Sequence, residues 1–260
     1  MDLVTAIVLG IIQGITEWLP ISSEAMVTLA GRFLFNMEYS EALGTAIWLH
    51  GGTAFAAVIY FREEIIKIIQ SIYKKDSDKS LLIFLIITTF FSAVIAISLI
   101  TFLFSMQIPD VYFTLLIGLF LIGIAFLHKN KKQNIISKNL TKTKAVIIGL
   151  IQGTSILPGI SRSGITIPVL LLEDFSLKQS FKLSFLMSIP VTLGASVFIP
   201  IIKQDFVLSL PLILSGIIAF IVGLLTIKLL MDFAEKINFY KATLVLGLFI
   251  ILLAILQFVL

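Results

Sequence analysis

One stretch of the sequence, QGITEWLPISSE at residues 13–24, places carboxylates, an amide and hydroxyls in otherwise apolar surroundings. Gln13 and Glu17 are four residues apart, a spacing that puts them on the same face of a helix. Pro20 then ends the helical run. A carboxylate at such a break can hold a divalent cation or act as a base, and Ser23 beyond it is a candidate nucleophile.

A second stretch of this kind, PGISRSGIT at residues 158–166, lies about half the chain further on. Arg162 places a guanidinium in an apolar setting, where an unpaired cation costs several kcal/mol, so an anion is expected nearby. Helix N-termini offer free N–H groups to phosphate oxygens, and arginine can bind the same oxygens through two N–H groups. The stretch therefore indicates a phosphate-binding tip. A buried structural ion pair of Glu17 with Arg162 is the plainer alternative.

The two stretches belong to an internal repeat. GIIQGITEWLPISS from Gly10 and GLIQGTSILPGISRS from Gly149 share Gln-Gly, Leu-Pro and serines that suit helix caps. Each predicts a proline-broken hairpin with arms too short to cross a bilayer, which takes about 20 apolar residues. Broken backbone at membrane depth is tolerated only where it is buried in protein or lines a cavity. The repeat thus predicts two re-entrant hairpins.

Composition predicts an all-α integral membrane protein, with 58% hydrophobic and 13% charged residues. The absence of cysteine excludes disulfides and thiolate sites, and a net charge of +4 is too small to indicate nucleic acid. We predict a single membrane domain of two repeats, each a hairpin plus three transmembrane helices. The first repeat covers 1–128, with its hairpin at 3–35 and spans at 41–61, 81–104 and 111–128; the second covers 142–260, with its hairpin at 145–172 and spans at 177–202, 206–231 and 240–260.

The number of crossings sets the topology. Three crossings per repeat is an odd number, so the second repeat is expected to be inverted in the membrane. Most of the 19 lysines and arginines fall in loops that this topology places in the cytoplasm, as the positive-inside rule requires. We therefore expect a multi-pass protein of the cell membrane, with both termini extracytoplasmic and the two broken tips meeting near mid-membrane.

At these residues the sequence resembles the BacA/UppP family, the membrane-embedded undecaprenyl-diphosphate phosphatases. The family's first motif, (E/Q)xxxE followed by F/W-L-P-[IV]-S-S, matches Gln13 to Ser23, and its second motif, PGxSRSxxT, matches Pro158 to Thr166. The resemblance implies hydrolysis of a polyprenyl diphosphate to the monophosphate and inorganic phosphate. That reaction recycles the lipid carrier for cell-envelope glycan synthesis and is associated with cell-wall biogenesis and bacitracin resistance.

The resemblance also implies roles for individual residues. Glu17, Ser23 and Arg162 would be catalytic, with Ser23 as the nucleophile or a phosphate ligand. Gln13 and Glu17 would hold a divalent metal cation, Mg or Ca, or serve in acid–base chemistry. The diphosphate would be bound by the remaining hydroxyls and the glycine of the two tips: Ser22, Ser161, Ser163, Gly164 and Thr166.

One position departs from the family pattern. Family members continue S-S-T-G-H, whereas this chain has SSEAM and places Met26, which has no proton to transfer, at the histidine position. Three readings follow: the histidine is dispensable, Glu24 or His50 replaces it, or the protein no longer hydrolyses its lipid. For His50 a hydrogen-bonded packing role is a further alternative.

A different class of function fits the same topology. Inverted repeats with broken helices are typical of secondary transporters, so a lipid-phosphate flippase or an anion transporter is the alternative function. Glu17 beside Ser23 favours hydrolysis, because a carrier of an anion needs cations rather than a carboxylate. The expected partners are a polyprenyl diphosphate lipid and the membrane, with no nucleic acid, and a homodimer is compatible with the sequence.

Overall fold

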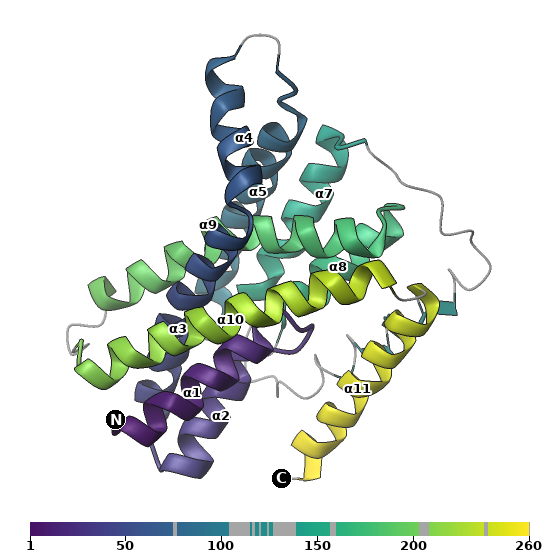
Figure 1. Ribbon diagram of the computed structural model, residues 1–260. Helices are drawn as coiled ribbons and strands as arrows, with labels where there is room; N and C mark the ends of the chain where they lie inside the picture. The colour runs from purple at the N-terminus through teal and green to yellow at the C-terminus, as the bar shows by residue number, and fades with distance from the viewer. Residues whose placement is uncertain are drawn as a thin grey trace. The chain divides into compact units, whose positions relative to one another are not determined.

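The computed structural model describes residues 1–74, 77–103, 115, 118–119, 121–123, 125–126, 139–156, 160–202, 208–236 and 239–259. All regular structure in these ranges is helical (Figure 1). The chain forms two compact units. The first unit contains Met1–Phe61 and Ser188–Leu230, and the second contains Arg62–Met187 and Met231–Leu260.

Four of the described helices are long and apolar enough to cross a membrane, which agrees with the predicted all-α multi-pass membrane protein. They are α3 (Tyr39–Tyr60), α5 (Ser80–Leu103), α9 (Leu177–Ile202) and α10 (Leu210–Lys236). The predicted span at 240–260 is α11 (Phe239–Val259). The predicted span at 111–128 lies largely outside the described residues.

The boundaries of α10 differ from the predicted span of 206–231. The hydroxyl of Ser209 accepts a hydrogen bond from the N–H three residues on, so the helix begins at Leu210. At the other end it continues to Lys236, because no proline or glycine in MDFAEK breaks a helix after the apolar run has ended.

The first hairpin consists of α1 (Leu3–Thr16) and α2 (Ser23–Phe35), both shorter than a membrane crossing. Asp2 begins α1, and Ser22 begins α2; each side chain accepts a hydrogen bond from the backbone N–H three residues on. Asn36 ends the hairpin in the left-handed conformation, with φ 51°, which an asparagine tolerates better than most residues. Pro20 lies in the turn between the two arms.

The second hairpin repeats this local structure. It consists of α7 (Lys142–Gly153), the short 3-10 turn η1 (Thr154–Ile156) and α8 (Arg162–Leu172). Thr141 and Ser161 accept capping hydrogen bonds in the same way as Asp2 and Ser22. The left-handed residue that follows α8 is Asp174, with φ 64°.

In the first unit, α1 packs against α10 through two glycines one helical turn apart. A Cβ at Gly10 would lie 2.6 Å from the carbonyl oxygen of Ser215, and one at Gly14 would lie 2.6 Å from Cβ of Val222. Only glycine permits such an approach, and small residues at this spacing are the usual means of close helix packing in a membrane. α1 is therefore in direct backbone contact with α10.

In the second unit, α7 packs against α5 in the corresponding way. A Cβ at Gly149 would lie 2.7 Å from the carbonyl oxygen of Thr88, and one at Gly153 would lie 2.7 Å from that of Ser92. Each hairpin thus packs on a long helix from the opposite half of the sequence: the first on α10, the second on α5.

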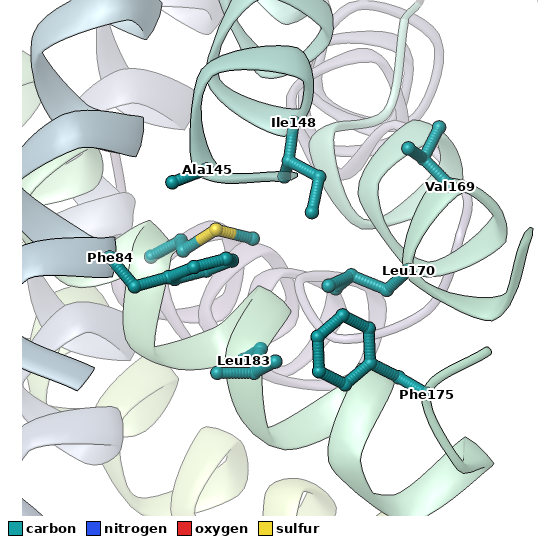
Figure 2. Packing of buried hydrophobic residues seen from close by; sticks show 8 residues of the cluster. Phe84, Ala145, Ile148, Val169, Leu170, Phe175 and Leu183 are labelled. Carbon is teal, nitrogen blue, oxygen red and sulfur yellow. The ribbon is translucent and has the colours of Figure 1, made fainter. Parts of the chain in front are cut away.

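Buried apolar side chains complete both units. In the second unit the cluster joins α5, α7, α8 and α9 around the second hairpin (Figure 2); its labelled members are Phe84, Ala145, Ile148, Val169, Leu170, Phe175 and Leu183. In the first unit the cluster joins α1, α2, α3 and α10: Leu9, Val27, Ala46, Leu49 and Ala219. Two indole N–H groups also bind carbonyl oxygens of α10, from Trp18 to Gly223 and from Trp48 to Leu212.

Candidate active site

Glu17 is the centre of the polar cluster in the first unit. It caps the C-terminus of α1 just before the break and is only 5% exposed. Its Oε2 accepts a hydrogen bond of 2.9 Å from Nε2 of Gln13 and one of 2.8 Å from the hydroxyl of Ser23. The four-residue spacing of Gln13 and Glu17 therefore produces a direct contact. Ser23, the first residue of α2, delivers its hydroxyl across the break.

His50 of α3 reaches the same carboxylate oxygen. Its Nδ1 lies 2.8 Å from the carbonyl oxygen of Ala46, an acceptor, so this nitrogen carries the proton. Its Nε2 lies 3.4 Å from Oε2 of Glu17. The imidazole is thus fixed in orientation by the backbone of its own helix, and its Nε2 faces the carboxylate.

The side-chain amide of Gln13 forms hydrogen bonds through its nitrogen but not through its oxygen. Its Nε2 contacts Thr53 Oγ1 at 3.5 Å in addition to Glu17, while its Oε1 is buried with no hydrogen-bond partner. Rotating the amide would set this oxygen against the carboxylate, so the assigned orientation is the favourable one. A buried acceptor with no donor is costly, and a bound cation or a water molecule would satisfy it.

The cluster fits a hard divalent cation only in part. A carboxylate and an amide oxygen are suitable ligands for Mg²⁺ or Ca²⁺. The part of the chain that the structure describes contains no group of three or more His, Cys, Asp or Glu side chains placed to hold a metal. A cation at Gln13 and Glu17 would therefore need further oxygens from a phosphate or from water, an arrangement that is normal for Mg²⁺.

Arg162 is the first residue of α8 in the second unit. Its Nη1 donates a hydrogen bond of 2.8 Å to the carbonyl oxygen of Ser184 on α9. Thr166, one turn further along α8, contacts the hydroxyl of the same Ser184 at 2.7 Å and donates to the carbonyl oxygen of Arg162. α9 therefore fixes the position of the guanidinium from outside the hairpin.

The remaining residues of the second tip lie at the N-terminus of α8. The hydroxyl of Ser161 accepts a hydrogen bond of 3.2 Å from the N–H of Gly164 and lies 3.1 Å from the hydroxyl of Ser163. All three residues are buried. Pro158 and Gly159, the first two residues of the second motif, lie outside the described residues.

The other residues predicted at the first tip, Ser22 and Glu24, lie at the start of α2. Ser22 is the N-terminal cap of α2 and is partly buried. Glu24 lies in the first turn of α2, also partly buried. The carboxylate that accepts the hydroxyl of Ser23 is that of Glu17. Met26 is likewise partly buried on α2.

The structure thus gathers the predicted residues into two groups. Gln13, Glu17, Ser23 and His50 contact one another in the first unit, and Arg162, Thr166, Ser161, Ser163 and Gly164 lie together in the second. Two further residues that contact these groups, Thr53 and Ser184, were not predicted. Thr53 follows His50 at helical spacing and could have been found from that spacing, whereas Ser184 carries no motif of its own.

Comparison with known proteins finds one family over almost the whole chain. A family model described as "Bacitracin resistance protein BacA" matches residues 6–256. An "Undecaprenyl-diphosphatase" of Methanococcoides burtonii is 35% identical over 97% of this chain and 98% of its own length. Proteins of the same description from Sulfurisphaera tokodaii and Saccharolobus solfataricus are 31% and 32% identical, over 95% and 96% of this chain and 95% of their own length.

Proposed function

Because the chain belongs to the bacitracin resistance protein BacA family, we propose that it hydrolyses a polyprenyl diphosphate of the undecaprenyl type. The products would be the lipid monophosphate and inorganic phosphate. The observation that supports this most directly is the hydrogen bond from Ser23 to the buried carboxylate of Glu17, with the imidazole of His50 on the same oxygen. A hydroxyl in contact with a base, and a ring nitrogen beside that base, is the arrangement of an activated nucleophile.

In the proposed first step Ser23 is the nucleophile. Glu17 Oε2 takes the hydroxyl proton as Oγ of Ser23 attacks the terminal phosphorus, and the bond from that phosphorus to the bridging oxygen breaks. The lipid monophosphate leaves, and water then attacks the phosphoserine, forming inorganic phosphate and restoring the hydroxyl. Nε2 of His50 is placed to receive the proton from Glu17 between the two steps.

The second tip would stabilise the charge on the transferring group. The guanidinium of Arg162 and the N-terminus of α8 are suited to phosphate oxygens, and the contacts with Ser184 hold them in place. A Mg²⁺ or Ca²⁺ ion held by Gln13 Oε1 and Glu17 would neutralise further charge on the diphosphate when bound. For this the two broken tips must meet inside the membrane.

That meeting requires the inverted repeat. In both hairpins a capping side chain begins each arm, a left-handed residue follows the second arm, and two glycines lie at matching places in the first arm. This supports two copies of one unit. With three crossings in each copy the second is inverted, both termini are extracytoplasmic, and the tips approach from opposite sides. A homodimer stays a prediction.

Phosphate release from farnesyl diphosphate by the purified protein tests the proposal, with and without EDTA. We expect release from the wild type and from the control Glu63→Gln, an exposed carboxylate of α4 (Arg62–Tyr73), and release slower by about a thousandfold or more from Glu17→Gln and Arg162→Ala. Trapping a phosphoserine at residue 23 would identify the nucleophile; a Ser23→Ala variant that retains most activity would assign the attack to water. Lipid-phosphate movement across proteoliposomes without release would instead support the transporter.

A further inference from the structure

A line of buried hydroxyls follows α9 through its membrane-spanning length. Ser180, Ser184, Ser188, Thr192 and Ser196 recur every fourth residue and are between 0% and 6% exposed. Residues at this spacing form one ridge of a helix, and the sixteen steps from Ser180 to Ser196 cover about 24 Å, most of the thickness of the hydrocarbon core. We call these five residues the hydroxyl ridge.

Two hydroxyls of the ridge, those of Thr192 and Ser196, give their protons to the backbone of their own helix. Thr192 donates to the carbonyl oxygen of Ser188, and Ser196 donates to that of Leu193. Each hydroxyl has only one proton to give, so its oxygen remains as an acceptor. Acceptors of this kind match the O–H groups of water and do not match the oxygens of a phosphate. Packing by small hydroxyl residues is the plainer explanation of such a ridge.

Two further features of α9 point to water. The hydroxyl of Ser180 is fully buried and has no hydrogen-bond partner in the described part of the protein. An unsatisfied buried hydroxyl costs roughly 1–3 kcal/mol, and ordered water is the usual partner. Pro190 also lacks an N–H group, so the carbonyl of Leu186, which is 2% exposed, has no helical donor. Packing alone would leave the hydroxyl of Ser180 unsatisfied.

The ridge also touches the second tip. Ser184 is the residue that contacts Thr166 and accepts from Arg162, and Ser180 lies one turn before it, toward the end of α9 where Lys178 is exposed. We infer that the hydroxyl ridge of α9 binds a file of water molecules inside the membrane and supplies water to the phosphate-binding tip at Arg162. The use of that water in hydrolysis rests on the proposed function; its presence does not.

The natural absence of cysteine makes the file directly measurable. Single substitutions Ser180→Cys and Ser188→Cys are reacted, in lipid nanodiscs, with a charged methanethiosulfonate reagent. The reagent attacks thiolates, which form only where water reaches the sulfur. Met187→Cys, in the apolar cluster beside the ridge, and Val197→Cys, 59% exposed on the same helix, are the matched controls.

We expect the two ridge cysteines to react at least about tenfold faster than both controls, because only they would ionise. Rates at Ser180→Cys and Ser188→Cys no higher than those of the controls overturn the inference. If either variant does not purify as a single species, Thr192→Cys, the next residue of the ridge, replaces it under the same criterion.

Activity separates this inference from the proposed function. Fast ridge labelling in a protein that releases no phosphate would leave the water file standing and remove the hydrolysis. Phosphate release without fast ridge labelling would leave the hydrolysis standing and remove the water file. Ser180→Leu, which fills the space of a water molecule, is expected to lower the rate of release about tenfold relative to Ser180→Ala, which leaves that space open.

Discussion

The first and second hairpins are built from the same local parts. Each arm begins at a side chain that caps its helix, each hairpin ends in a left-handed residue, and each packs through two glycines on a helix of the other half. These features act through backbone conformation and close packing. They fix where the backbone breaks and how closely it approaches its neighbour.

The hairpins differ in the charges placed on that common frame. The first residue after the capping serine is Ser23 in one hairpin and Arg162 in the other. Glu17 stands before the first break, whereas the corresponding turn η1, Thr154–Ile156, contains no carboxylate. One hairpin thus holds an acid and a hydroxyl, and the other a cation. The two hairpins therefore share a backbone frame, and a few side chains supply the chemistry that distinguishes them.

Removing the cation should have the largest effect. Arg162→Ala is expected to lower kcat/KM for farnesyl diphosphate by about ten-thousandfold, the scale on which an arginine stabilises a transferring phosphoryl group. Arg162→Lys should recover only part of this loss, because lysine cannot make the two parallel hydrogen bonds. Steady-state phosphate release measures both. Full activity of Arg162→Ala would show that the second hairpin is structural only.

Removing the base should cause the second-largest loss of activity. Glu17→Gln keeps the shape of the side chain but cannot take the proton of Ser23, so we expect a loss of about a thousandfold in kcat. His50→Leu should cost less, about a hundredfold, because His50 acts through Glu17. His50→Leu activity equal to that of the wild type would assign the histidine to packing.

Glu24→Gln in the same assay tests the other replacement for the absent histidine: the hypothesis expects abolished release, and full activity rules it out.

These residues also show what could be predicted from the sequence. The contact of Gln13 with Glu17 follows from helical spacing, and the caps at Ser22 and Ser161 follow from residue type. The approach of His50 to Glu17 could not be derived, because it depends on how α3 packs against the first hairpin. Tertiary packing, which local pattern does not encode, decided it.

The fold, like the site, has parts that the sequence predicts and parts that it does not. Hydrophobic runs and helix caps predicted the helices to within a few residues, since both are local properties. Which long helix each hairpin packs against was not predicted. The glycine pair of each hairpin is visible in the sequence, but its partner is chosen by the fit of α10 or α5 to that surface.

The common frame predicts equal sensitivity at matched glycines. Gly14→Ala and Gly153→Ala should each destabilise the protein by about 1–3 kcal/mol, because the added methyl group overlaps the partner helix. Gly194→Ala is the control: its Cβ would meet nothing within 4 Å, and alanine is the better helix former. Thermal unfolding in detergent measures all three. A large effect at only one of Gly14 and Gly153 would break the equivalence of the hairpins.

The helices that follow the two hairpins, α3 and α9, each form an ion pair, and the two pairs differ in distance and exposure. The smallest predicted effect on stability comes from these pairs. Nζ of Lys182 in α9 lies 2.6 Å from Oε1 of Glu64, whereas Glu41 in α3 lies 3.8 Å from the N-terminal amine and is 52% exposed. Burial tends to raise the pKa of Glu64, but the hydrogen bond and the charge of Lys182 outweigh it and hold that pKa below its usual value of 4.5. A carboxyl whose pKa is lowered by folding stabilises the folded state above its ordinary value and loses that contribution as the pH falls.

Glu64→Gln should therefore lower stability by about 0.5–1 kcal/mol at pH 7, within the range of partly exposed ion pairs. Glu41→Gln should cost less, because its partner is more distant and the carboxylate more exposed. Melting temperatures of both variants and the wild type, taken at pH 7 and again below pH 4.5, give the comparison. The difference between wild type and Glu64→Gln should narrow at the lower pH, where the carboxylate becomes protonated in the unfolded and then in the folded state. A difference that stays constant would mean that Glu64 acts through packing and not through its charge.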